Sequence, residues 1–105
     1  MTLNKDKSCF GLSVATLGKI RSALKRYPEI ERVVLYGSRA KGNAEAGSDI
    51  DLTIIGDRFT ERQLTCLEMD LDDLMLPYQI DLSRLQDIKN QDLVDHIERV
   101  GKVFL

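Results

Sequence analysis

This 105-residue chain has no tryptophan, one histidine, two prolines and two cysteines. Because the cysteines follow no disulfide or zinc-binding pattern, we expect both to be reduced thiols. No apolar run approaches the roughly 20 residues that a membrane-spanning helix needs. The segment from Met1 to Ser8 also lacks the apolar stretch of a signal peptide. These absences predict a cytoplasmic protein that does not cross a membrane.

An excess of positive charge is missing as well. The formal net charge is −2, so the chain shows no general basic footprint for nucleic acid. Repeats, low-complexity segments and linkers are absent, and the length suits one small hydrophobic core. We therefore expect a single domain over residues 1–105, in which residues 1–12 form a flexible or loosely packed N-terminal segment.

A turn rich in small residues follows the first predicted strand. The strand covers Ile30–Tyr36 and consists mainly of β-branched and other apolar residues. It ends at Gly37 and Ser38, after which a short helical turn is expected. Such a turn directs free backbone N–H groups at a bound anion. Gly37 allows close approach of a phosphate, Ser38 adds a hydroxyl, and Arg39 or Lys41 adds positive charge. An ordinary turn between two elements is the alternative.

Two carboxylates lie close together in the next predicted strand, Asp49–Gly56. Side chains alternate between the faces of a strand, so Asp49 and Asp51 should project from one face and the intervening apolar residues from the other. Adjacent carboxylates repel unless a cation lies between them. Mg²⁺ is the expected cation, because it prefers carboxylate, water and phosphate oxygens. The pair could instead cap a helix or meet an arginine.

A third carboxylate repeats this local pattern. Gln79 to Leu82 resembles the segment at Asp49, and Pro77 before it suits entry into a strand. If Leu82 faces the core, Asp81 points to the same surface as the first two acids. Three converging carboxylates match a two-metal site for displacement at phosphorus. Asp81 could instead act as the general base, or be an exposed acid on an edge strand.

Together these residues resemble a known family. Gly37 and Ser38, then ten residues, then Asp49 and Asp51, and a later lone Asp81 form the signature of the DNA polymerase beta-type nucleotidyltransferase superfamily. More narrowly, segments 35–42, 47–52, 76–83 and 95–103 resemble the minimal nucleotidyltransferases (MNT proteins) of bacteria and archaea. The resemblance covers roughly residues 13–105.

The resemblance implies a Mg²⁺-dependent enzyme of the phosphorus-group-transfer class. It would move a nucleoside monophosphate, expected to be AMP, from ATP or another NTP to a hydroxyl, with pyrophosphate as the leaving group. The nucleotide-binding residues would be Gly37, Ser38, Arg39 and Ser48. The catalytic and metal-binding residues, at a two-metal site, would be Asp49, Asp51 and Asp81.

Three longer helices are expected to complete an α/β (α+β) domain. The first begins at Ser13 as N-cap and ends before Pro28. The second opens on a capping box of Thr60 and Gln63, with an apolar stripe comprising Leu64, Leu67, Leu71, Leu74 and Met75. The third spans about residues 90–100. The family resemblance implies that the sheet is small, mixed and three-stranded.

The chain leaves few residues for binding an acceptor. The resemblance implies a partner, namely a small helical protein of the HEPN or substrate-binding type encoded by a neighbouring gene. The pair would act as a two-component enzyme or a toxin–antitoxin module. A catalytically silent module that neutralises its helical partner is the alternative function. The apolar residues that could either contact that partner or lie in the core are Phe10, Leu12, Phe59 and Phe104.

Overall fold

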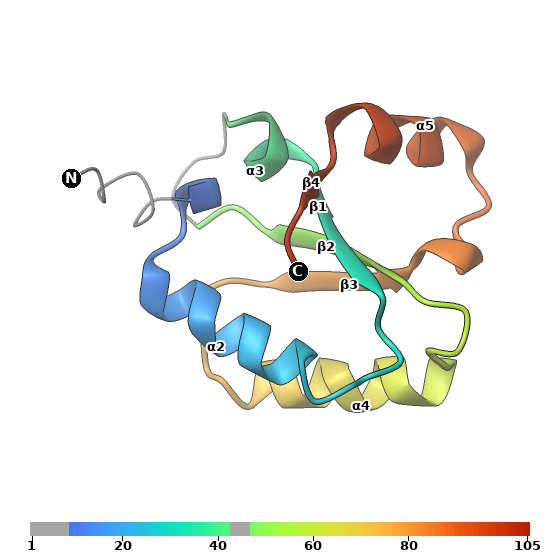
Figure 1. Ribbon diagram of the computed structural model, residues 1–105. Coiled ribbons are helices and arrows are strands. Elements are labelled where there is room, and N and C mark those ends of the chain that lie inside the picture. The colour runs from blue at the N-terminus through green and yellow to red at the C-terminus, as the bar shows by residue number, and fades with distance from the viewer. Residues whose placement is uncertain (1–8, 43–46) are drawn as a thin grey trace.

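The computed structural model describes residues 9–42 and 47–105. Its elements, shown in Figure 1, are in chain order the 3₁₀ helix η1 (Cys9–Gly11), α2 (Val14–Leu24), β1 (Arg32–Tyr36), α3 (Ser38–Lys41), β2 (Ile50–Ile55), α4 (Glu61–Asp72), β3 (Ile80–Arg84), the 3₁₀ helix η2 (Leu85–Asp87), α5 (Gln91–Val100) and β4 (Lys102–Val103). None of the described helices is long and apolar enough to cross a membrane.

The strands form one mixed sheet in the order β3-β2-β1-β4. Strand β1 is antiparallel to β2 and β4, whereas β2 and β3 run parallel. The predicted α/β class and mixed sheet are confirmed, but the sheet has four strands rather than three. The additional strand, β4, is only two residues long and exposed, so it has no alternating pattern. It forms because the chain leaving α5 returns beside Val34 and Leu35.

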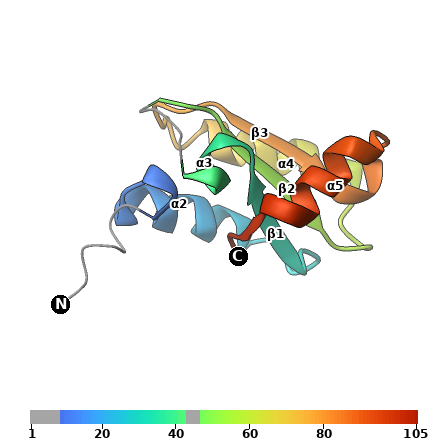
Figure 2. The same ribbon diagram turned by 90° about the horizontal axis from the view of Figure 1, so that it is seen from above.

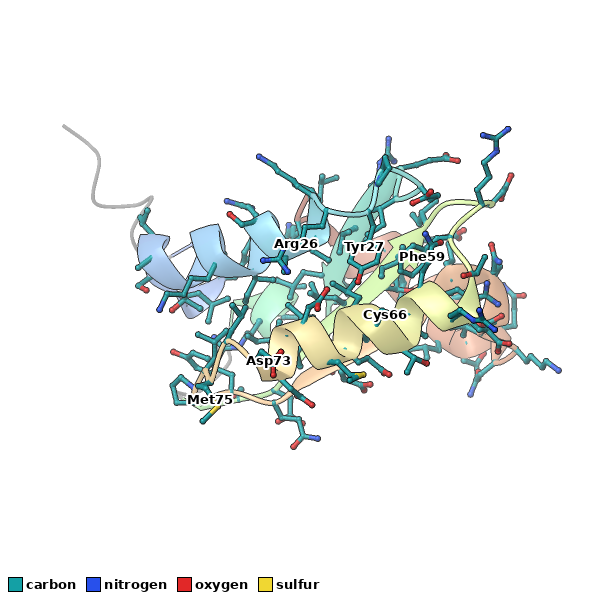
Figure 3. The ribbon with its side chains drawn as sticks, turned by 90° about the horizontal axis from the view of Figure 1, so that it is seen from below. Arg26, Tyr27, Phe59, Cys66, Asp73 and Met75 are labelled. Carbon is teal, nitrogen blue, oxygen red and sulfur yellow. The ribbon has the colours of Figure 1, made fainter. Side chains whose placement is uncertain are left out.

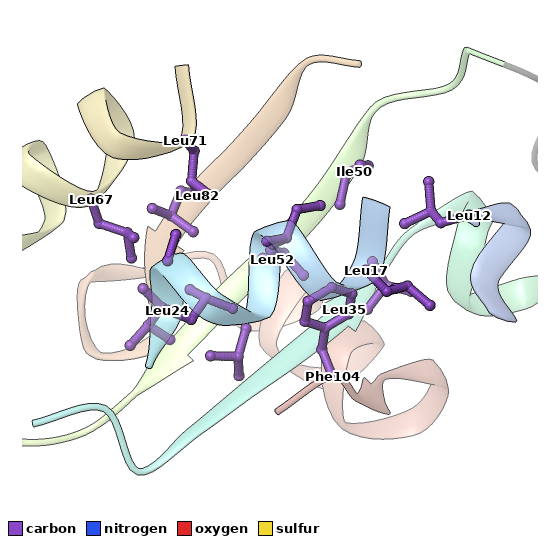
Figure 4. Packing of buried hydrophobic residues seen from close by; sticks show 14 of the residues in the cluster. Leu12, Leu17, Leu24, Leu35, Ile50, Leu52, Leu67, Leu71, Leu82 and Phe104 are labelled. Atoms are coloured by element: carbon purple, nitrogen blue, oxygen red, sulfur yellow. The ribbon is translucent and has the colours of Figure 1, made fainter. Parts of the chain in front are cut away.

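Helices cover the two faces of the sheet unequally. The longer helices α2 and α4 lie on one face, and α3 and α5 lie on the other (Figures 1 and 2). Alternate residues of the strands face α2 and α4, as Val33, Leu35 and Leu52 do with no exposed surface. Figure 4 shows the core between these layers, in which the labelled side chains are Leu12, Leu17, Leu24, Leu35, Ile50, Leu52, Leu67, Leu71, Leu82 and Phe104.

Residues that the sequence left open between core and interface belong mainly to the core. Leu12, Phe59 and Phe104 are at most 2% exposed, and Phe10 packs against the cluster. The ring of Phe10 lies 5.8 Å from that of Phe104. Phe10 and Leu12 therefore pack in or against the core, whereas Gly11 between them is exposed. The rest of that segment, residues 1–8, lies outside the described residues.

The helix start signals in the sequence are confirmed. The Ser13 side chain accepts a hydrogen bond from the backbone N–H of Thr16. Thr60 and Gln63 exchange both hydrogen bonds of a capping box. These side chains satisfy backbone N–H groups that have no partner within the helix. The helices therefore begin where local chemistry predicts.

Asp70, on the acidic face of α4, contacts Arg26 and Tyr27 in the segment that follows α2. The Tyr27 hydroxyl donates to Asp70 at 2.7 Å, near the position where Figure 3 shows the end of α2 beside α4. Burial, followed by the bond to Asp70, raises the pKa of Tyr27 to about 12. This contact links the two helices that cover the core.

The prediction that Met75 continues the apolar stripe of α4 is wrong. The helix ends at Asp72, and Met75 takes a left-handed backbone conformation with φ 55°. Its side chain is 84% exposed and lies beyond the end of the helix in Figure 3. The helix stops here because the chain must reverse toward Pro77 and β3.

We expect Met75→Gly to stabilise the protein by about 0.5–1 kcal/mol, because glycine removes the strain of a left-handed residue beyond a helix end. Met69→Gly is the control, since Met69 is also exposed but lies within α4. It should destabilise by about 1 kcal/mol. Urea unfolding measures both, and equal effects of the two changes would contradict the assignment of strain to Met75.

Candidate active site

The predicted phosphate-binding turn joins β1 to α3. Gly37 is the N-cap of α3, with φ 81° and ψ −156°, a backbone conformation that is nearly restricted to glycine. It has no side chain to cap the N–H groups that follow. Ser38 is the first residue of this helix and is exposed. The first N–H groups of α3 and the Ser38 hydroxyl therefore lie together at the end of β1.

The antiparallel pairing of β1 with β2 gives Gly37 a second reason to be glycine. Tyr36 is the register partner of Asp51, so the next residue crosses close to the aspartate. A Cβ added to Gly37 would lie 2.5 Å from Oδ2 of Asp51. The sequence offers only one reason for a glycine at this position, namely the close approach of a phosphate. The structure shows that it also leaves space for the Asp51 carboxylate.

The parallel pairing of β2 with β3 brings two of the predicted acids together. Asp51 and Asp81 are register partners, and residues opposite one another in a sheet project from the same face. Asp49 lies two residues before Asp51, immediately before β2. Asp51 is partly buried, whereas Asp49 and Asp81 are exposed. The three acids therefore gather at one end of the sheet, on the face opposite the main core.

Electrostatics support this arrangement. The pKa of Asp51 is raised, first by burial and then by the negative charges of Asp81 and Asp49. The charge of each neighbour therefore reaches Asp51. Among residues 9–42 and 47–105, however, no group of three or more histidine, cysteine, aspartate or glutamate side chains is arranged to hold a metal ion. The acids share a face, but the structure does not draw them into a metal-binding cluster.

Hydroxyl groups line the sheet next to the acids. Ser83 Oγ donates to Thr53 Oγ1 at 3.1 Å, and Thr53 is completely buried. Burial raises the pKa of Tyr36, a hydrogen bond with Ser83 lowers it, and the charges of Asp81 and Asp51 raise it. This polar layer was not identified from the sequence. Its only sequence signal is that Thr53 and Ser83 follow Asp51 and Asp81 by two residues each.

Arg39 lies where the sequence did not place it. It was expected as a charged, exposed group at the nucleotide, but it is 3% exposed. Its Nε and Nη2 donate to the carbonyl oxygen of Ser48 at 3.1 and 2.9 Å, and Nη1 donates to the carbonyl oxygen of Phe10 at 2.9 Å. The expectation of an exposed Arg39 is wrong, because its guanidinium is buried against the backbone of Ser48 and Phe10.

The remaining predicted site residue, Ser48, is half-buried beside Asp49. Its backbone carbonyl is the acceptor for Arg39. The structure thus places Gly37, Ser38 and Ser48 near the end of the sheet that carries the acids. Their contact with a nucleotide stays a prediction.

A family comparison agrees with this geometry. The family described as "Polymerase beta, Nucleotidyltransferase" matches residues 18–105, which include the turn, the acids and the whole sheet. This chain belongs to that family. Comparison with curated proteins gave no significant match.

Solved structures with the same fold support the assignment. One chain of a toxin–antitoxin crystal structure with AMP-PNP has a TM-score of 0.69 and 22% identity, covering 85% of this chain and 72% of that one. Chains from the toxin–antitoxin MntA-HepT and from a tri-AMPylated Shewanella oneidensis HEPN toxin with its MNT antitoxin each have a TM-score of 0.64 and 19% identity. Each match covers 87% of this chain and 70% of the other. At these identities the likeness concerns the fold.

In this nucleotidyltransferase domain, we expect Gly37→Ala to lower the free energy of unfolding by about 1–3 kcal/mol, owing to backbone strain and the contact with Asp51. If Gly37 served only phosphate approach, the loss of fold stability would be modest. Gly42→Ala is the control, because Gly42 also has a positive φ but no atom lies within 4 Å of the added Cβ.

A double-mutant cycle separates the contact from the strain. Combining Gly37→Ala with Asp51→Gly removes the carboxylate that the new Cβ would meet. Chemical unfolding of the single and double variants should then show a coupling energy of about 0.5 kcal/mol or more. Strictly additive effects would show that Gly37 is required for its backbone conformation only.

The raised pKa of Asp51 predicts a pH-dependent cost of ionisation. The folded protein holds this proton more tightly than the unfolded chain, so stability falls as pH rises from the unfolded value near 3.8 through the folded pKa. Without divalent cations, Asp51→Asn should raise the stability at neutral pH by less than about 1 kcal/mol, because solvent screens this partly exposed group.

The measurement is urea unfolding in EDTA at a pH close to the unfolded value of 3.8 and again at neutral pH. The variant's advantage should be larger at the higher pH. Asp57→Asn removes an exposed carboxylate away from the site and should show no such pH-dependent gain. A loss of stability in Asp51→Asn at neutral pH would contradict charge repulsion at the acids.

Proposed function

We propose that this chain transfers AMP from ATP, with Mg²⁺, to a hydroxyl group of a small helical HEPN-type partner protein. The pairing of Asp51 with Asp81 beside the Gly37 turn carries this proposal. Family membership supports the reaction class. The solved structures of similar fold include a complex with AMP-PNP and a tri-AMPylated HEPN toxin bound to an MNT antitoxin, which support ATP and the partner.

The donor set suits Mg²⁺. Asp49, Asp51 and Asp81 supply hard oxygen ligands on one face. Burial and then the charges of the other two acids raise the pKa of Asp51, and a cation would relieve the repulsion among the three. When bound at these carboxylates, Mg²⁺ would neutralise charge on the triphosphate and on the leaving pyrophosphate. Two such ions are the proposed stoichiometry.

The protein's own groups would orient the reactants. The N–H groups at the start of α3 and the hydroxyl of Ser38 would bind the triphosphate, and Ser48 would help to enclose it. The acceptor oxygen attacks the α-phosphorus while the bond to the β-phosphate oxygen breaks, which releases pyrophosphate. Asp81 is exposed on the outer strand β3, where it could accept the proton of the incoming hydroxyl.

A silent module that only neutralises its partner is the second candidate. It is favoured by one observation, namely that the described acids are not arranged as a metal-binding group. Repulsion among carboxylates without a cation explains the same observation for an active enzyme.

The proposed location of the protein is the cytoplasm, where ATP is available.

Two experiments test the proposal. The first is calorimetry with ATP. The second measures transfer of labelled AMP to the protein encoded beside this chain. ATP should bind with Mg²⁺ and far more weakly with EDTA. Asp49→Asn and Asp51→Asn should abolish transfer. Asp81→Asn should lower the rate by about 10²–10⁴-fold as expected for a lost general base, while retaining more of the MgATP affinity.

Asp57→Asn is the matched control and should transfer AMP at the wild-type rate. Equal ATP affinity with and without EDTA would contradict the metal-dependent site. If the wild-type chain binds and neutralises its partner without AMP transfer, the silent module is correct. A wild-type rate in Asp81→Asn would remove that residue from the catalytic set.

A further inference from the structure

The buried guanidinium of Arg39 connects three segments that are distant in sequence. Arg39 belongs to α3, and its donors reach the carbonyl oxygens of Ser48 and Phe10. The guanidinium carbon also lies 5.0 Å from the centre of the Tyr78 ring. These contacts join the turn after β1 to the loop before β2, the N-terminal segment and the entry to β3.

The contacts with Ser48 act directly beside an acid of the site. Two donors, Nε and Nη2, converge on one carbonyl oxygen at 3.1 and 2.9 Å, which restricts the peptide group that leads into Asp49. On the other side of Asp49, the N–H of Ile50 donates to the carbonyl of Gln79 at 2.9 Å. The backbone of Asp49 is therefore held from both sides, by Arg39 and by Gln79, the residue before β3.

The surrounding backbone is shaped to enclose this side chain. Gly11 has φ 75°, and a Cβ there would lie 3.0 Å from Nη1 of Arg39. The Tyr78 ring, from a different segment, lies against the guanidinium. Tyr78 is followed by Gln79, whose carbonyl oxygen accepts the hydrogen bond from the N–H of Ile50. A buried cation is costly unless its donors are satisfied, and here backbone carbonyls at the site satisfy them.

We propose that Arg39 is a positioning residue that orients Asp49 toward the metal and triphosphate by holding the Ser48 carbonyl, and that it does not contact the nucleotide. This inference rests on the proposed nucleotidyl transfer. Its geometric part, restraint of the chain at Asp49, holds independently of catalysis. Lysine cannot replace arginine in this role, because an ammonium lacks the planar fork that places two donors on one oxygen and stacks on a ring.

The test compares Arg39→Lys with Arg21→Lys. Arg21 has the same two kinds of contact, since its Nε donates to the carbonyl of Phe104 at 2.9 Å and its guanidinium lies 5.0 Å from the Phe104 ring. It is on α2 and touches none of the proposed site residues. Both variants keep the positive charge and most of the side-chain volume, so both are expected to fold.

Two measurements separate positioning from general stability. Amide hydrogen exchange by NMR should be faster at Ile50 in Arg39→Lys than in wild type, relative to Val33, whose N–H bonds to Leu105. The Mg²⁺ concentration for half-maximal transfer should rise by about 10-fold or more, the usual cost of losing a group that orients a metal ligand. Saturating Mg²⁺ should restore most of kcat. Arg21→Lys should leave both quantities unchanged.

The inference is overturned if Ile50 exchange and the Mg²⁺ requirement of Arg39→Lys equal those of Arg21→Lys. It is also overturned if Arg39→Lys loses ATP affinity while Ile50 exchange is unchanged, since that result indicates direct contact with phosphate. If the wild-type chain shows no Mg²⁺-dependent transfer, the proposed function fails, and the exchange data alone decide whether Arg39 restrains the chain at Asp49.

Discussion

The parallel register of β2 and β3 places Asp51 directly beside Asp81, and the chemistry of this domain depends on that pairing. Two like charges on neighbouring strands work against folding, and burial together with these charges raises the pKa of Asp51. The opposite face of the same strands is mainly apolar, with Ile50 and Leu52 completely buried. The main core therefore supplies the stability that allows the charged face to exist.

The antiparallel register of β1 and β2 adds a second constraint at the same place. It brings the turn after Tyr36 across the Asp51 carboxylate, where only a glycine leaves enough space. The turn at Gly37 and the carboxylate of Asp51 therefore restrict one another sterically. A ligand that bound to both would couple them further. A substitution at Gly37 changes the position of a carboxylate that is fourteen residues away in sequence but adjacent in space.

The face that carries the acids is covered only in part. Helix α5 packs near Val34, where a Cβ on Gly101 would lie 2.6 Å from that side chain, and the hydroxyls of Thr53 and Ser83 bond to each other in the adjoining layer. Beyond this layer, Asp49 and Asp81 are exposed. The same sheet face therefore changes from packed to accessible within one strand length.

The sequence by itself determined most of the helices and strands, and it predicted the candidate site residues. Strand alternation put the three acids on one face, and the caps at Ser13 and Thr60 marked helix starts, because these signals are local. Tertiary structure decided β4, the exposure of Met75 and the burial of Arg39. Each of these depends on where separate segments meet: the chain after α5 beside β1, the chain after α4 at the entry to β3, and Phe10 and Ser48 at Arg39. Contacts between segments far apart in sequence leave no local pattern from which they can be read.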